Sequence, residues 1–306
     1  MRSYLEAVMV FTVFLGLSSY LHQDLSQSTV YFLIKHIRAE GLKVTSYVEL
    51  ESPKTFNKGS LLKASALEVW LLQLDKHKRV SFEFEKTKES LEFVGSNFLL
   101  MHWHNDSIRV VEGGGSWCRI RQDMFVKLLA FLDESKGFCV NKSLDFMHYG
   151  CLPTPEVGPS TWETRRDCEY WFLRRFFESS PVFEQFLVFL RHNESYWLIR
   201  FLLAQSTQSI RNQSAVKIQE LGRYYGVSSS HFRRLCHQAL GSSAKVEMCN
   251  WRMARTFHEI AGCRGKLVFI AMNNGYSSAS HLSCEIKKNL GFSPNEIGKM
   301  HWLTSK

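Results

Sequence analysis

The chain has 306 residues, of which 45% are hydrophobic and 22% charged, a composition that provides a packed core and excludes a disordered tail or a polytopic membrane protein. Its formal net charge is +9 at pH 7, and the segment from Gln205 to Lys306 holds fourteen Lys and Arg against five Glu and no Asp, so this last third carries the whole net charge. A neutral N-terminal part and a basic C-terminal part indicate a polyanion-binding module at the C-terminus, with nucleic acid favoured over lipid as its ligand.

The first 40 residues form a hydrophobic N-terminal segment whose role the sequence leaves open. From Ala7 to Leu21 no residue is charged. A signal peptide would need a more basic start, and a spanning helix needs about 18 to 20 apolar residues, so both fit poorly. We expect a buried or interfacial helix here. An inner-membrane anchor through residues 7–21 is the alternative, and a start codon further downstream is a third explanation.

Residues 41–150 are predicted to form a regulatory region of α+β structure. Between Lys43 and Cys118 the hydrophobic pattern has period two, most clearly at Val80, Phe82 and Phe84, which indicates short antiparallel strands. The glycine run 113–115 is predicted to close these strands as a flexible turn. After it, apolar residues at helical spacing predict a short amphipathic helix over 122–134.

Residues 151–205 are predicted to contain a linker and an aromatic helical region. Three prolines between Gly150 and Thr164 favour a linker or long loop. From Asp167 to Ser206 the sequence is helical and unusually aromatic, with a break at Ser180-Pro181 that suits the start of a second helix. The aromatic side chains form either a core that joins two domains or a surface on which a partner docks.

Residues 206–306 contain the same arrangement twice, over Ile218–Gly241 and Val268–Pro294. In each copy a short helix is predicted to end at a glycine, and a serine caps a second helix that stops at another glycine. Two helices joined by a tight glycine turn, with polar and basic residues outside, are typical of a helix-turn-helix. The segment Lys245–Ile260 has helical spacing and is predicted to be a rigid spacer between them. We therefore predict an all-α DNA-binding domain of two helix-turn-helix units joined by a long helix.

The outward-facing side chains of the two second helices are the candidate DNA-binding residues. In the first copy the apolar residues Phe232, Leu235 and Cys236 face inward by spacing. The outward set is Ser230, His231, Arg233, Arg234 and His237 in the first copy, and Ala279, Ser280, His281, Ser283, Cys284, Lys287 and Lys288 in the second.

Arginine can donate two hydrogen bonds to a guanine in the major groove, which makes Arg233 and Arg234 the strongest candidates for base reading. Contact of one of them with phosphate alone is the alternative, since most protein–DNA hydrogen bonds go to the backbone. In the second copy we expect weaker base reading through Ser280 and Ser283, with His281, Lys287 and Lys288 nearer to phosphates.

These motifs resemble the AraC/XylS family of transcription regulators. The matches include Leu221, Gly226, Phe232, Trp251-Arg252-Met253-Ala254, Gly275-Tyr276-Ser277 and the closing Gly291-x-Ser293-Pro294. By this resemblance, the positions of Ser230, Arg233 and Arg234 usually read bases. Many relatives carry an Arg where this chain has Cys284, which leaves no long donor on the second reading face.

Within that family, segments such as CEYWFLRRF, YYGVSSSHFRRLC and NNGYSSASH resemble the InvF/MxiE-type activators of type III secretion genes. The resemblance implies a cytoplasmic, sequence-specific activator of type III secretion or effector genes involved in virulence. Its implied partners are double-stranded promoter DNA, RNA polymerase and a secretion chaperone as co-activator, and a homodimer is left open. A membrane-anchored regulator and a small-molecule-sensing regulator of the same family are the alternatives.

No catalytic residue, metal site or cofactor is predicted, and an enzyme is the least favoured class. The pair His102-x-His104 has no correctly spaced acid and no third histidine to complete a metal site. The eight cysteines contain no C-x-x-C pair, which argues against a zinc ribbon and favours reduced thiols in a cytosolic protein. Cys284 on the DNA face has no clear activating neighbour.

Overall fold

The computed structural model describes nine stretches of the chain, and the predicted N-terminal segment 1–40 lies outside them. These stretches are 52–74, 79–94, 97–138, 149–153, 175–176, 181–211, 218–261, 265–291 and 293–296. The described residues divide into two compact units, here called the sheet unit (within 46–129 and 140–196) and the helical unit (within 130–139 and 197–306). No helix in the described stretches is long and apolar enough to span a membrane.

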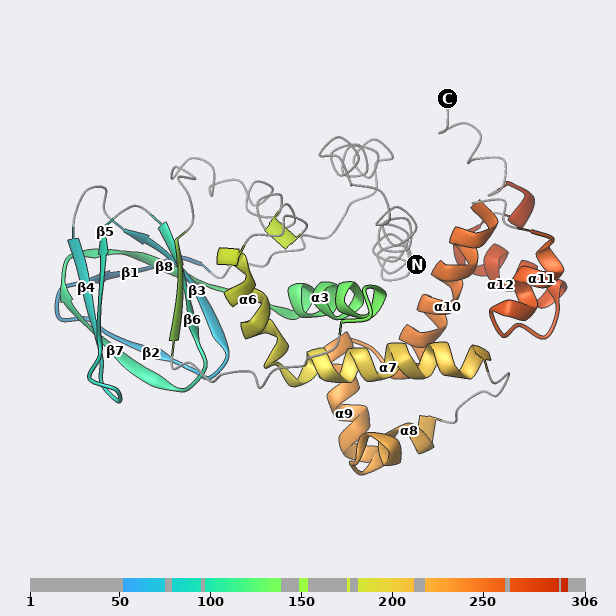
Figure 1. Cartoon of the computed structure of the whole chain (residues 1–306), viewed down its shortest axis with the longest axis horizontal. Helices are drawn as coiled ribbons and strands as arrows, with labels where there is room; N and C mark the ends of the chain where they lie inside the picture. The colour runs from blue at the N-terminus through green and yellow to red at the C-terminus, as the bar shows by residue number, and fades with distance from the viewer. Residues whose placement is uncertain are drawn as a thin grey trace. The chain divides into compact units, whose positions relative to one another are not determined.

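The sheet unit contains two antiparallel sheets (Figure 1), as the period-two pattern predicts. The five-stranded sheet has the order β1 (Lys54–Asn57), β8 (Gly114–Ile120), β3 (Glu68–Leu74), β6 (Asn97–His102), β9 (Tyr149–Pro153). The four-stranded sheet has the order β2 (Leu61–Ala64), β7 (Asp106–Glu112), β4 (Arg79–Phe84), β5 (Ser90–Val94). Side chains from both sheets share one apolar core, which includes Trp70 of β3 and Phe82 of β4.

The glycine run 113–115 differs from the prediction, because only its first residue lies in a turn. Gly113 has φ 80°, whereas Gly114 and Gly115 belong to β8. A Cβ added at Gly115 would lie 2.4 Å from the carbonyl oxygen of Gln73 on the neighbouring strand β3. Gly113 therefore forms the turn, and Gly115 allows β8 and β3 to approach closely.

The predicted linker also begins later than Gly150. Residues 149–153 form β9, whose register pairs Tyr149 with His102 and Pro153 with Phe98 of β6. Since β9 is an edge strand and Pro153 is its last residue, the missing backbone N–H of the proline is tolerated there. Residues 154–174 lie outside the described stretches.

The aromatic region is largely interior where the structure describes it. Phe183, Phe186 and Phe189 of α6 (Pro181–Arg191) are at most 2% exposed. Phe186 packs against Phe125 and Phe176, and Phe189 meets Trp103 edge to face at 4.7 Å. Trp197 is 39% exposed, and Phe201 is half-buried. The burial of the α6 aromatics therefore favours packing inside the sheet unit over a docking surface for this part of the region.

The helical unit contains the end of α3 (Asp123–Ser135), most of α7 (Glu194–Arg211) and α10 (Ala244–Ala261). The bounds of α3 are close to the predicted 122–134. Within the unit, Phe131 of α3 meets Trp251 of α10 edge to face at 5.4 Å. Arg200 of α7 pairs with Glu134 of α3 at 3.0 Å. Helix α3 thus packs against both α7 and α10 in this unit.

Candidate nucleic-acid interface

Two pairs of helices lie on either side of α10 in the sequence, as predicted. The first helix pair consists of α8 (Ile218–Tyr225) and α9 (Ser229–Leu240), and the second helix pair of α11 (Leu267–Asn273) and α12 (Ala279–Leu290). The turns contain Gly226 at φ 87° and Gly275 at φ 73°. These left-handed conformations favour glycine because it has no Cβ, and they permit the sharp turn between the helices.

The caps of α9 and α12 are the residues that the sequence pattern predicts. The hydroxyl of Ser228 accepts a hydrogen bond from the backbone N–H of His231, and that of Ser278 accepts one from His281. Both helices end at a left-handed glycine, Gly241 or Gly291. The caps satisfy backbone groups that the helix ends leave unpaired and so fix where each helix begins and ends.

The outer face of α9 carries all five predicted candidates. Ser230, His231, Arg233, Arg234 and His237 are exposed, whereas Phe232, Leu235 and Cys236 are buried. On the inner face, Phe232 packs against Phe201 of α7 and Tyr225 of α8. Burial raises the pKa of the Cys236 thiol to about 11, which keeps it neutral. Helix α9 therefore presents two guanidinium groups and two imidazoles from a firmly packed support.

The outer face of α12 is poorer in long donors. Ser280, His281, Cys284, Lys287 and Lys288 are exposed, Ala279 and Ser283 are half-buried, and Leu282 and Ile286 form the inner face. The Ser283 hydroxyl donates to the carbonyl oxygen of Ala279 at 2.8 Å, inside its own helix. That bond occupies the single proton that Ser283 could offer to a base.

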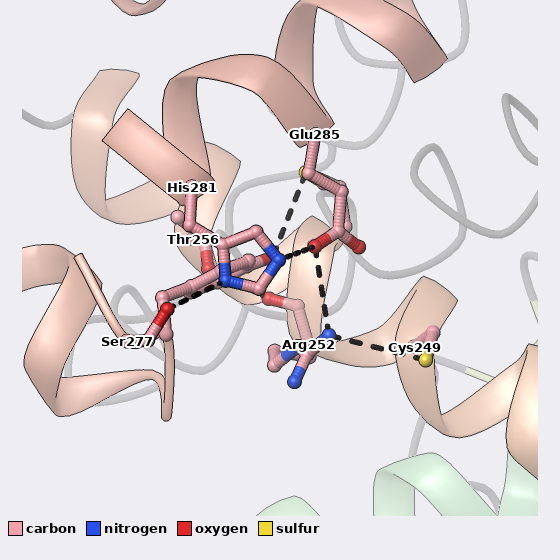
Figure 2. Close-up of polar contacts among 8 residues, drawn as sticks. Cys249, Arg252, Thr256, Ser277, His281 and Glu285 are labelled. Carbon is pink, nitrogen blue, oxygen red and sulfur yellow. Dashed lines mark hydrogen bonds and ion pairs between the residues drawn. The ribbon is translucent and has the colours of Figure 1, made fainter. Parts of the chain in front are cut away.

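One polar cluster beneath this face was missed by the sequence reasoning (Figure 2). Glu285 of α12 lies 3.6 Å from Arg252 of α10 and 3.9 Å from Nε2 of His281. The Nδ1 atom of His281 is 3.0 Å from the hydroxyl of Ser277. Arg252 in turn stacks over the ring of Tyr276 at 4.6 Å. His281, which was expected only near phosphate, is thus also held from within the protein.

The cluster keeps the phenol of Tyr276 protonated, because burial and then the nearby Glu285 carboxylate raise its pKa to about 12. Glu285 is the only acid in the sequences of α9 and α12. With Glu285 half-buried beside Arg252, the exposed charged groups of the two helices are all bases or histidines. Such a face attracts a polyanion.

Comparison with known proteins gives close relatives but no matching family model. The chain is 37% identical over 218 residues to the invasion protein InvF of Salmonella typhimurium, covering 66% of this chain and 97% of that protein. It is 31% identical over 207 residues to the transcriptional regulator MxiE of Shigella flexneri, covering 66% of this chain and 94% of that protein. Among solved structures it is similar to a transcriptional regulator with an AraC-type DNA-binding domain from Chromobacterium violaceum. That similarity has a TM-score of 0.29 and 22% identity, over 33% of this chain and 91% of the other.

Proposed function

We propose that this chain, which belongs to the AraC family as an InvF/MxiE-like transcriptional regulator, activates transcription by binding promoter DNA through its two helix pairs. In this proposal the pairs α8–α9 and α11–α12 are helix-turn-helix units, and α9 and α12 are their recognition helices. Each recognition helix enters the major groove, and α10 connects the two units.

The observation that carries the proposal is the clean division of α9 into two faces. Phe232, Leu235 and Cys236 fix the helix from inside, while Arg233 and Arg234 extend outward from consecutive positions. Guanidinium groups fit the acceptor pattern of guanine in the major groove, and each good bidentate contact discriminates by about 1 to 3 kcal/mol. We assign base reading to Arg233 and Arg234, with Ser230, His231 and His237 at the edges of the contact.

We assign a supporting role to α12. Its exposed long donors, Lys287 and Lys288, lie together in the last turn, where they suit phosphate contact. Ser280 retains an exposed hydroxyl for weak base contact, and Ala279, Ser283 and Cys284 line the same face. Affinity from α12 is therefore mostly electrostatic, whereas selectivity comes mostly from α9.

Helix α10 suits the role of a spacer. Its 18 residues span about 27 Å at the standard rise of an α-helix. Recognition helices that enter successive major grooves lie about 34 Å apart along the DNA. A single chain with a connector of this length can place two recognition helices on one face of the duplex, and it thereby reads an asymmetric site without a second copy.

We propose that the chain activates type III secretion and effector genes in the cytoplasm. A secretion chaperone acts as its co-activator, and the chain recruits RNA polymerase to the promoters. Mapping of bound DNA across the genome, in cells with and without the chaperone gene, tests these points together. We expect binding upstream of secretion and effector genes, with expression from those promoters dependent on the chaperone. Binding without any enrichment at promoters would contradict the proposed function, and chaperone-independent expression would contradict only the co-activation.

A further inference from the structure

The two recognition helices are fastened to the rest of the molecule in different ways. Glu285 lies seven residues after the N-cap Ser278, and Leu235 lies seven residues after the N-cap Ser228, so the two occupy the same place in their helices. Leu235 is 8% exposed and packs as an ordinary core residue. In α12 the same place holds a carboxylate that faces the connecting helix α10. A charged contact thus replaces an apolar one in the second helix pair.

The carboxylate of Glu285 and the guanidinium of Arg252 are largely shielded from water. Their side chains are 20% and 28% exposed, and their closest atoms are 3.6 Å apart. The guanidinium also lies 3.9 Å from the Cys249 sulfur (Figure 2). It stacks on the Tyr276 ring as well, so it is held from several sides. Charged groups in such surroundings interact more strongly than on an open surface, and their geometry is more restricted.

The apolar core of the second helix pair restricts this geometry less sharply than a directional contact does. Met253 and Ile260 of α10 pack with Ile270 of α11 and with Leu282 and Ile286 of α12. Apolar burial is non-directional, so such a core favours association of the helices over a range of angles. A partly buried ion pair favours the one arrangement in which its two groups meet.

We infer that Arg252 and Glu285 set the angle between α12 and the connecting helix α10, and that they thereby determine which spacing between the two DNA half-sites the chain accepts. This inference rests on the proposed function. The two residues act as positioning residues, because the carboxylate and the guanidinium pair with each other beneath the face that carries Ser280, Lys287 and Lys288.

DNA geometry makes spacing a sensitive measure of that angle. One inserted base pair moves the second half-site by about 3.4 Å along the axis and turns it by about 35° around the axis. A second helix pair held at a fixed angle cannot follow this displacement without losing contacts. A second helix pair held only by its apolar core can rotate and partly recover them.

The experiment uses the full chain and a duplex that the unsubstituted chain selects from a pool of random duplexes. Footprinting locates its two half-sites, and further duplexes carry one or two inserted base pairs between them. The variants are Glu285→Gln, which removes the charge, and Glu285→Leu, which copies the residue at the same place in α9. Glu220→Gln is the matched control, because it removes one exposed acid from α8 in the first helix pair.

For the unsubstituted chain and for Glu220→Gln we expect one inserted base pair to weaken binding about tenfold, within the range that a mismatched base pair costs. For both Glu285 variants we expect one inserted base pair to weaken binding only about threefold or less. Footprint protection of the first half-site should stay unchanged. Thermal unfolding verifies that the variants are folded. Arg252→Lys, which keeps the charge but loses the planar fork, provides the same comparison if either Glu285 variant is unfolded.

If one inserted base pair weakens binding of the folded Glu285 variants as much as it weakens binding of the unsubstituted chain, the inference is overturned and the proposed function is left intact. An unsubstituted chain that binds its selected site equally well at all spacings would overturn it too. Failure of the unsubstituted chain to select any sequence would instead contradict the proposed function itself.

Discussion

Arg233 and Ser283 occupy equivalent places in the two helix pairs, each five residues after the serine that caps its helix. Arg233 is exposed, whereas Ser283 is half-buried and donates its hydroxyl proton to Ala279 of its own helix. The next place along holds Arg234 in α9 and Cys284 in α12. The two outer faces therefore differ in the groups that can read a base, although the backbones that carry them are alike.

The first prediction concerns base reading by α9. Arg233→Ala should weaken binding to the cognate site by about 1 to 3 kcal/mol and relax the preference at one base pair, because one bidentate contact is lost. Competition binding against single-base variants of the site measures both effects. Arg223→Ala removes an exposed base from α8 and serves as the control. Unchanged selectivity in Arg233→Ala would show that α9 reads through another residue.

The second prediction concerns phosphate contact by α12. Lys287→Ala should weaken binding to specific and random duplexes alike, and it should lower the slope of log affinity against log salt concentration by about one. Titrations over a series of salt concentrations give that slope. A loss confined to the cognate sequence would place Lys287 at a base edge instead.

The third prediction concerns the cap of α9. Ser228→Ala should lower the free energy of unfolding by about 0.5 to 2 kcal/mol, because the backbone N–H of His231 loses its acceptor. Urea unfolding monitored by circular dichroism measures the change. The neighbouring Ser229→Ala, in an exposed position, should change it by less than about 0.5 kcal/mol. Equal effects at the two serines would contradict the assigned cap.

The fourth prediction concerns His102 in the core of the sheet unit. Burial lowers its pKa from 6.5 to about 3 in the folded chain. Between these two pH values the unfolded chain binds a proton that the folded chain does not bind, so stability falls as the pH decreases through this window. His102 can change the free energy of unfolding by at most about 1.4 kcal/mol per pH unit.

His102→Leu removes the titrating group and keeps an apolar side chain against Trp70, whose ring lies 4.4 Å from that of His102. Urea unfolding of both proteins from neutral to acidic pH should show a smaller pH dependence for the variant. Identical pH dependence in the two proteins would mean that folding does not lower the pKa of His102.

The parts of the fold that the sequence predicts are those with a local physical signal. The alternation at Val80, Phe82 and Phe84 predicts a half-buried strand, and β4 buries all three. The glycine turns and the serine caps of α9 and α12 also depend on neighbours along the chain, and they lie where predicted. The outward direction of Arg233 and Arg234 follows from helical spacing alone.

The parts that the sequence did not predict depend on partners far along the chain. The pairing of Arg252 with Glu285 joins residues on different helices, and nothing in either local pattern indicates it. The strand role of Gly115 depends on the carbonyl of Gln73 in a neighbouring strand. One signal for the Arg252–Glu285 pair was available in the sequence. Glu285 stands where the first copy has the buried Leu235, and a charged side chain on the inner face of a helix requires a partner.

We propose that the chain reads DNA with two unequal recognition helices, of which α9 is the principal reader. The most direct test is a scan of every single-base-pair substitution in the selected duplex, with the half-site of α9 identified as the one whose protection Arg233→Ala weakens. We predict that substitutions in that half-site each weaken the binding free energy by about 1 to 3 kcal/mol, and that substitutions in the other half-site weaken it less. Losses of binding free energy spread evenly over both half-sites, or concentrated in the half-site of α12, would show that α9 is not the principal reader.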